Sequence, residues 1–373
     1  MEMKKEKAVI CVIVIIAITS FGYGIMVGHY NFFPFEELKG MKILVMESEE
    51  YDEDSMPVTN VELFIDIENN DDIEKKKKQL KDYIWKNSVM GNSKIILEES
   101  IIDERYTKLN NLKQINKISV TMEHGINSES YLFLSNESNN KLIIYHQGHD
   151  GDFYLGINTI DFFLKNNYNV LAFSMPLHGM NSQPIVEIPR IGTMKLFLHQ
   201  QLQLLDNSEF SSMKFFVEPI YASLELIEKK YNFEQYNMIG ISGGGWTSTI
   251  YPVVDDRISK SFSIAGGLPI ALRSNFEDKG DYEQVLPEMY RLMNYAEMYV
   301  VASIGDERKH IQIFNKYDPC CYAGEKHEMY TDSIKLKIKE LGNGYFQTYS
   351  DTTHKEHKIS QFSLELVIKE MNS

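Results

Sequence analysis

One short pattern constrains the fold of this chain more than any other: an apolar segment, a serine between glycines, and a second apolar segment. The run Tyr-Asn-Met-Ile-Gly-Ile leads into Ser242, and Gly-Gly-Gly-Trp follows it. A serine held on a sharp turn between a strand and a helix needs small neighbours, because the strand and the helix approach each other closely there. Gly240 and Gly244 provide this room. The pattern predicts a strained turn that presents Ser242 as a nucleophile; the alternative is a purely structural turn.

Apolar strands and helices alternate on both sides of this pattern. We predict strands at residues 61–67, 94–97, 117–122, 131–134, 141–145, 169–174, 237–241, 261–265, 298–303, 311–315 and 345–349. We predict helices at residues 71–86, 158–165 and 213–230, from 246 onward, and at 359–371. This alternation is typical of an α/β fold with a mostly parallel central sheet that helices cover on both faces.

Two further motifs precede the serine in a recognisable order. The loop His-Gln-Gly-His-Asp-Gly-Asp at 146–152 follows the apolar run Lys-Leu-Ile-Ile-Tyr, and Pro-Leu-His-Gly-Met-Asn-Ser at 176–182 follows the next predicted strand. With the serine turn, they resemble the oxyanion loop, the Pro-Gly-His-Gly-x-Ser turn and the nucleophile elbow of the α/β-hydrolase superfamily, especially its esterase and prolyl-oligopeptidase-like branches. Leu177 stands where glycine is usual. The resemblance covers about residues 130–373 and implies an α/β-hydrolase fold with serine hydrolase activity.

The superfamily order of nucleophile, acid and histidine selects the other members of a triad. Asp318 follows the predicted strand at 311–315 and is the expected acid, with Asp306 and Glu307 as second choices. The alternative role for Asp318 is to form an Asp-Pro turn. His357, just before the last helix, is the expected general base, and His354 is the alternate. In this hypothesis the histidine takes the serine proton and the acid orients the imidazole.

A tetrahedral oxyanion needs two fixed hydrogen-bond donors. The resemblance implies that the backbone N–H of Gly243 is one of them. It implies that the N–H of Gln147 or of Gly148 is the other, because both lie in the loop at the oxyanion position.

We expect no metal and no other cofactor. The polar residues of the loop look like ligands at first sight: His146, His149, Asp150 and Asp152. However, His-x-x-His on a glycine-broken loop lacks the i, i+4 helical spacing of zinc hydrolases, and no third ligand is evident in the sequence. Of the three cysteines, Cys320 and Cys321 are adjacent. Adjacent cysteines rarely form a structural bridge, so we also expect no disulfide framework.

The N-terminal sequence predicts where the chain works. Residues 1–7 (MEMKKEK) read as a cytoplasmic end, and residues 8–28 read as a transmembrane signal anchor. This stretch is uncharged and long enough to cross a bilayer. A cleaved signal peptide and a buried soluble helix are the alternatives. The expected location of the catalytic domain is extracytoplasmic, in the periplasm or at the cell surface, with secretion if the segment is cleaved. Residues 29–129 read as an extension of uncertain independence, and 130–373 as the catalytic domain.

The composition of the chain limits the classes of molecule that it is expected to bind. The formal net charge of −15 and the lack of a basic stripe argue against a nucleic-acid partner. Two stretches between core elements, 183–212 and 268–297, suit a lid over the site. The function that these features favour is hydrolysis of an acyl ester of a small molecule, with membrane attachment through the N-terminal helix. The alternatives are a peptidase for short peptides and a membrane-anchored binding protein that keeps the fold without turnover.

Overall fold

The computed structural model describes residues 16, 19–24, 60–273 and 277–373. The chain divides into two compact units, Met1–Val58 and Thr59–Ser373. In the first unit, the described residues are helical. No helix among the residues that the structure describes has both the length and the apolar content needed to cross a membrane. The predicted anchor at 8–28 lies largely outside the described residues, so it stays a prediction.

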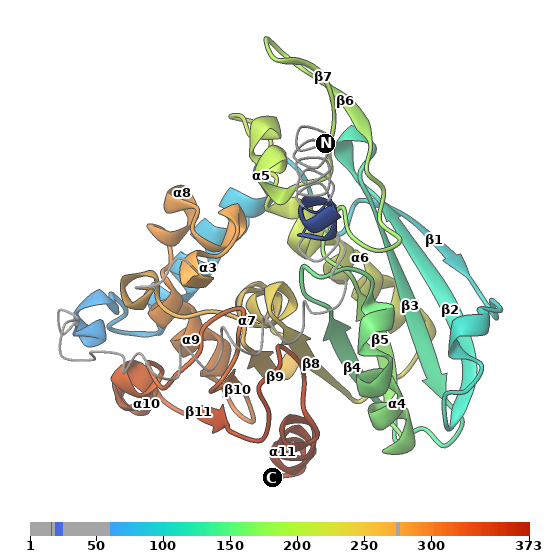
Figure 1. Cartoon of the computed structure of the whole chain (residues 1–373). Helices are drawn as coiled ribbons and strands as arrows, with labels where there is room; N and C mark the ends of the chain where they lie inside the picture. The colour runs from blue at the N-terminus through green and yellow to red at the C-terminus, as the bar shows by residue number, and fades with distance from the viewer. Residues whose placement is uncertain (1–15, 17–18, 25–59, 274–276) are drawn as a thin grey trace, which may run out of the picture. The chain divides into compact units, whose positions relative to one another are not determined.

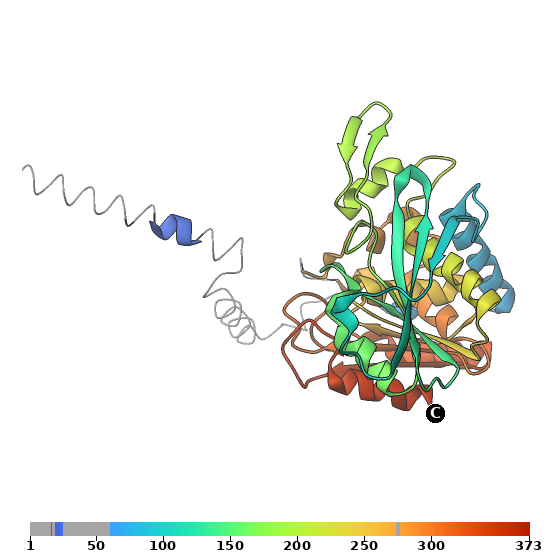
Figure 2. The same cartoon turned by 90° about the vertical axis from the view of Figure 1, so that its right-hand side faces the viewer.

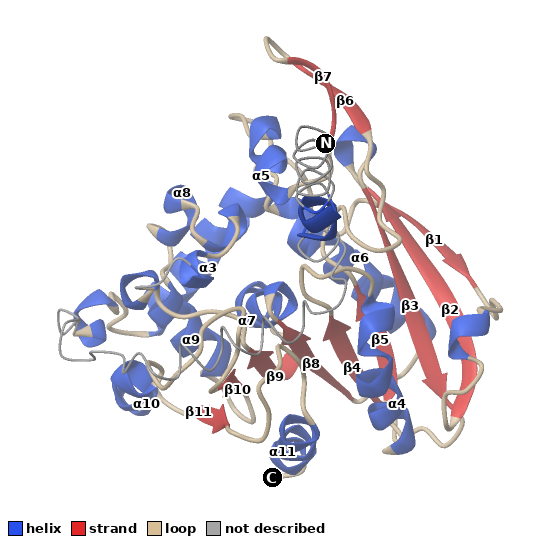
Figure 3. Ribbon diagram, in the orientation of Figure 1, coloured by secondary structure: helices blue, strands red, loops and turns tan. Residues whose placement is uncertain are grey.

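A nine-stranded sheet forms the centre of the second unit (Figures 1 and 3). Its strand order is β1-β2-β3-β5-β4-β8-β9-β10-β11. The strands are β1 (Lys94–Glu98), β2 (Leu112–Thr121), β3 (Asn127–Ser135), β4 (Lys141–His146), β5 (Asn169–Phe173), β8 (Gln235–Ile241), β9 (Ile258–Ile264), β10 (Lys309–Asn315) and β11 (Tyr345–Asp351). Every pair of neighbouring strands from β5 to β11 in this order is parallel. The pairs β1–β2, β2–β3 and β3–β5 are antiparallel. The predicted mostly parallel sheet is confirmed.

Helices cover both faces of this sheet (Figure 1). One face packs against α4 (Ile157–Lys165) and α11 (Gln361–Met371). The other face packs against α6 (Lys214–Lys230), α7 (Gly243–Val254), α9 (Tyr295–Ser303) and α10 (Glu328–Leu341), and α3 (Asn70–Trp85) packs against α7. The central strands are buried on both faces, as in β5, where all five residues are buried. This explains why they read in the sequence as continuous apolar runs rather than as alternating ones.

The N-terminal extension belongs to the same folded unit from residue 60 onward. It supplies α3, β1, β2 and the start of β3, and the predicted boundary at residue 130 falls inside β3. The prediction of a strand at 61–67 is wrong, because Val61–Phe64 form a 3-10 turn, η2, and residues 65–67 belong to no strand. The side chain of Asn60 accepts a hydrogen bond from the Glu62 N–H, which stabilises the first turn.

The prediction of a strand at 298–303 is also wrong, since these residues lie in α9. All nine residues of α9 are buried, so the segment is apolar on every side and carries no helical period. Its start is fixed by Asn294, whose side chain accepts a hydrogen bond from the N–H of Glu297. That capping pair was the available sequence signal for a helix.

The two predicted lid stretches fold as small elements between the core strands. The first contains the hairpin β6 (Ile185–Ile188) and β7 (Gly192–Lys195), then α5 (His199–Leu202) and η6 (Gln203–Leu205). Figure 2 shows this hairpin standing away from the sheet. The second contains η7 (Ile270–Leu272), η8 (Glu277–Lys279), η9 (Tyr282–Gln284) and α8 (Pro287–Tyr290) before α9.

The strand β8 and the helix α7 pack unusually close to each other. A Cβ atom on Gly240 would lie closer than 3.0 Å to the carbonyl oxygen of Gly244, and one on Gly244 would meet the carbonyl oxygen of His146 as closely. Both obstacles are backbone atoms, which cannot rotate away. The predicted need for small residues at Gly240 and Gly244 is therefore confirmed.

This packing generates a stability prediction. Gly240→Ala should lower the free energy of unfolding by about 3 kcal/mol, because the added methyl group forces the strand and the helix apart. Denaturant unfolding followed by circular dichroism measures the change. Gly22→Ala is the control, since nothing among the described residues lies within 4 Å of a Cβ placed there. Equal stability of the Gly240 variant and the wild type would contradict the close approach.

A buried histidine in β10 makes the stability depend on pH. Burial lowers the pKa of His310 to about 3. The unfolded chain binds a proton at this side chain below about pH 6.5, whereas the folded chain does not until about pH 3, so stability is lost as the pH falls through this window. Between pH 6 and 4, the free energy of unfolding should fall less steeply in His310→Phe than in the wild type, by about 1.4 kcal/mol per pH unit. Urea unfolding at several pH values tests this, and identical slopes would contradict it.

Candidate active site

Ser242 lies between the end of β8 and the start of α7, as the pattern predicts. Its backbone has φ 56° and ψ −123°, in a region that side-chain-bearing residues rarely adopt. Two hydrogen bonds hold this conformation: the Ser242 N–H donates to the Ile264 carbonyl (2.9 Å), and its carbonyl accepts from the Trp246 N–H (2.9 Å). The strained turn is confirmed. It places the serine at the carboxyl edge of the parallel strands, where α/β proteins place their ligand sites.

The loop after β4 covers the serine. Gly148 lies against it, since a Cβ on Gly148 would be 2.7 Å from Ser242 Cβ and 3.4 Å from its Oγ. Gly243 is the first residue of α7, so its N–H is one of the groups for which the helix offers no acceptor. Both predicted donors therefore border the serine, and their role in binding an oxyanion stays a prediction.

The structure does not support Gln147 as an oxyanion donor. Its N–H already donates to the carbonyl of Phe173 (2.9 Å), because the pairing of β4 with β5 continues one residue past the end of the strand. Its side chain accepts from Tyr145 Oη and donates to Asp150 (2.7 Å). Gln147 thus shapes the loop, and Gly148 is the predicted donor that remains in it.

Asp318 and His357 lie together, as the sequence order predicts. Their Oδ2 and Nδ1 atoms are 2.7 Å apart, and the Asp318 side chain is fully buried, while that of His357 is 18% exposed. The second carboxylate oxygen accepts the N–H groups of Cys320 (2.8 Å) and Cys321 (3.3 Å). Asn315 also donates to Oδ2 (3.2 Å). Hydrogen bonds thus fix both oxygens of the carboxylate. Asp318 lies in the loop after β10 and holds His357, which lies in the loop after β11.

The other candidates for these two positions lie elsewhere. His354 Nε2 is 3.3 Å from Oδ2 of Asp351, and the alignment is too poor for a hydrogen bond. Asp306 and Glu307 precede β10, at the end of the strand opposite to the Asp318 loop. There they line a separate cavity of about 580 Å³ together with Arg308. The geometry thus separates Asp318 and His357 from every alternative that the sequence left open.

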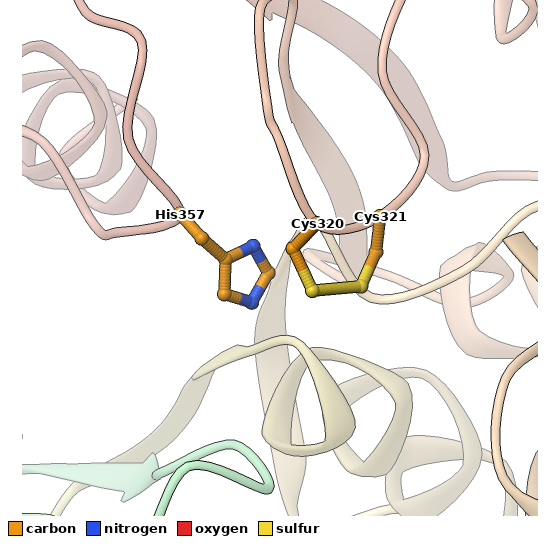
Figure 4. Close-up of side chains that lie close together, drawn as sticks. All are labelled: Cys320, Cys321 and His357. Atoms are coloured by element: carbon orange, nitrogen blue, oxygen red, sulfur yellow. A yellow bond between two sulfur atoms is a disulfide. The ribbon is translucent and has the colours of Figure 1, made fainter. Parts of the chain in front are cut away.

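Cys320 and Cys321 form a disulfide beside His357 (Figure 4). The expectation that adjacent cysteines form no bridge is therefore wrong here. The turn that follows Asp318 explains it, because the carboxylate accepts the N–H groups of both cysteines and holds them in one tight turn. Both sulfur atoms lie within 4.8 Å of a His357 ring nitrogen. The bridge closes no long loop, so it does not amount to a disulfide framework.

A second polar cluster adjoins the serine turn on the side of the β4 loop. His149 Nε2 lies 2.9 Å from Glu283 Oε1 and 3.0 Å from Asp281 Oδ2, and His199 Nδ1 lies 3.3 Å from the same Glu283 oxygen. Burial alone would raise the pKa of Glu283, but His199 and His149 hold it well below its ordinary value. Burial would lower the pKa of His199, but Glu283 raises it overall.

Sequence reasoning missed this cluster. It considered His149 only with its loop neighbours and found no third ligand, whereas His199, Asp281 and Glu283 come from the two lid stretches. His146 does not take part, because its Nδ1 contacts the Gln147 carbonyl at 2.9 Å. No local spacing joins residues so far apart in the chain. The only signal was that both lid stretches carry charged or imidazole side chains amid apolar ones.

Comparisons with known proteins bear on the fold. No family model matches the sequence, and no curated protein matches it. Among solved structures, the chain is similar to acetyl xylan esterase 1 from Thermoanaerobacterium sp. JW/SL YS485, with 14% identity, a TM-score of 0.50, and coverage of 85% of this chain and 98% of that one. It is also similar to methylesterase BT1017, with 11% identity, a TM-score of 0.52, and coverage of 90% and 68%. Together with the sheet order and the serine turn, these similarities show that the chain has the α/β-hydrolase fold.

Proposed function

We propose that this chain is a serine hydrolase that cleaves a carboxylic ester through Ser242, His357 and Asp318. The observation that carries the proposal is the 2.7 Å contact between Asp318 and His357. These two residues follow β10 and β11 at the same sheet edge where β8 ends in Ser242. The shared edge and the chain order match those of a triad in this fold, which supports the proposal.

The mechanism follows from the hydrogen-bond roles. Asp318 accepts the Nδ1–H of His357, which leaves the Nε2 lone pair free to take the Ser242 proton. The serine oxygen attacks the ester carbonyl, and the carbonyl π electrons move to the oxygen, which the N–H groups of Gly243 and Gly148 stabilise. The C–O bond to the alcohol then breaks as His357 returns the proton to the leaving oxygen. Water repeats these steps on the acyl-enzyme and releases the acid.

The names of two similar structures support a carboxylic ester as the substrate. The two similar structures are named acetyl xylan esterase and methylesterase. We propose that the ester carries a short acyl group, for example an acetyl group on a saccharide, in line with the first of these names. We also propose that the catalytic domain lies outside the cytoplasm, because the N-terminal sequence has the pattern of a signal anchor.

An active-site probe tests the nucleophile. A fluorophosphonate should label the full-length wild type, and Ser242→Ala should abolish the label, because the probe reacts only with an activated serine. Ser248→Ala is the matched control, since this buried serine of α7 donates to the Gly244 carbonyl and should leave labelling intact. An unlabelled but folded wild type would favour a binding protein without turnover. Subsequent assays with p-nitrophenyl esters and aminoacyl amides distinguish an esterase from a peptidase.

The two C-terminal histidines should differ sharply. His357→Ala should lower kcat for p-nitrophenyl acetate by about 10⁴-fold or more, because it removes the general base. His354→Ala should have a much smaller effect, since His354 faces Asp351 rather than Asp318. Steady-state kinetics on both variants give the answer. A larger loss in the His354 variant would reverse the assignment.

A further inference from the structure

We propose that His149, His199, Asp281 and Glu283 form a binding site for one Zn²⁺ ion beside the serine turn. Each residue offers one ligand atom, and the four atoms lie within 4.8 Å of one another. The set holds two imidazole nitrogens and two carboxylate oxygens, which are ligand types that zinc accepts in tetrahedral sites. The site does not depend on Ser242 being a nucleophile.

The spacing of the ligand atoms fits one small ion. The separations that involve Glu283 Oε1 are 2.9 Å to His149 and 3.3 Å to His199, and His149 lies 3.0 Å from Asp281. Metal–ligand bonds of about 2.0 Å place the ligand atoms of a tetrahedron about 3.3 Å apart. These three separations are thus close to the tetrahedral value, and the remaining ones are within 4.8 Å.

The hydrogen bonds of His199 prepare it as a ligand. Its Nε2 lies 2.8 Å from the carbonyl of Pro176, which can only accept, so the hydrogen resides on Nε2. In the neutral ring, the Nδ1 lone pair then faces Glu283. A backbone carbonyl that fixes the tautomer of an imidazole in this way is the usual outer partner of a metal-binding histidine.

Glu283 is an independent sign of a missing positive charge. Its side chain has no exposed surface, and its Oε2 atom has no hydrogen-bond partner in the part of the chain that the structure describes. No lysine or arginine among the described residues pairs with Glu283 or with Asp281. A single N–H on His149 Nε2 cannot point at both carboxylates, whereas one cation can bind both carboxylates at once. A buried and incompletely paired carboxylate is costly, and a bound cation would remove that cost.

The site would join three distant segments around the serine turn. His149 lies in the loop after β4, His199 in α5, and the two acids lie at η9. The other edge of the His149 ring packs on the turn, since a Cβ on Gly243 would be 2.6 Å from its Nδ1. Zinc on Nε2 would thus hold both lid stretches and the oxyanion loop in place, with the imidazole between the ion and Gly243. We infer a positioning role rather than contact with the substrate.

Zinc binding to the full-length chain tests the proposal directly. Protein stripped with a chelator should take up one zinc ion per chain, measured by elemental analysis and by competition with a chromogenic chelator, and its melting temperature should rise. Glu283→Gln and Asp281→Asn should each weaken zinc binding by about 100-fold or more, because each removes an anionic ligand. His178→Gln is the matched control: its ring lies 5.2 Å from that of His199 but supplies none of the four atoms.

The cysteine pair requires its own control, because reduced Cys320 and Cys321 with His357 could also bind zinc. The titrations are therefore repeated on a Cys320→Ser, Cys321→Ser background, and X-ray absorption at the zinc edge should show only nitrogen and oxygen neighbours. Wild-type protein that takes up no zinc would overturn the proposal. Zinc with sulfur neighbours, or zinc affinity that Glu283→Gln and Asp281→Asn leave unchanged, would overturn it as well. None of these measurements requires the esterase activity.

Discussion

The backbone reversal at Ser242 is the constraint on which the rest of the site depends. Side chains along a strand point to the two faces of the sheet, where helices bury them, so a reactive hydroxyl cannot stand on the strand itself. The positive φ of Ser242 brings its side chain out at the strand's end, and the close contact of β8 with α7 stabilises this turn. The β4 loop must then pass directly over the serine, which leaves no space for a side chain at Gly148.

Much of this architecture is readable from the sequence, for a physical reason. Strands that are covered on both faces are mostly apolar, so β4 and β5 stand out as short runs that are apolar between their end residues. In a parallel sheet every such strand ends at the same edge, so polar residues that follow the runs gather there. This is why the order of Ser242, Asp318 and His357 along the chain was enough to predict that the last two lie in contact.

The errors have equally specific causes. Complete burial of α9 removes the period that distinguishes a helix from a strand, so its sequence predicts a strand. The sequence leaves Gln147 and Gly148 as alternative donors, because nothing in it shows that the pairing with β5 continues past the last residue of β4. The cluster around Glu283 depends on how two lid stretches fold back onto the β4 loop, and such tertiary contacts leave no local pattern. The pair Cys320 and Cys321 was visible, but its bridge depends on the turn that Asp318 organises.

The strand order suggests how the two polar networks divide the work at the serine. In the sheet, β8 lies between β4 on one side and β9, β10 and β11 on the other. The loops that carry Asp318 and His357 therefore follow strands on one side of β8, and the loop that carries His149 follows the strand on the other side. In each network a carboxylate with a fully buried side chain holds a partly exposed imidazole: Asp318 holds His357, and Glu283 holds His149. In the proposed mechanism, the Asp318–His357 pair must keep Nε2 of His357 free for proton transfer. In the other network, Nε2 of His149 lies against the carboxylates, and the Nδ1 edge of the ring packs on Gly243. In the proposed mechanism, one network thus supplies the base, and the other fixes the loop that carries Gly148.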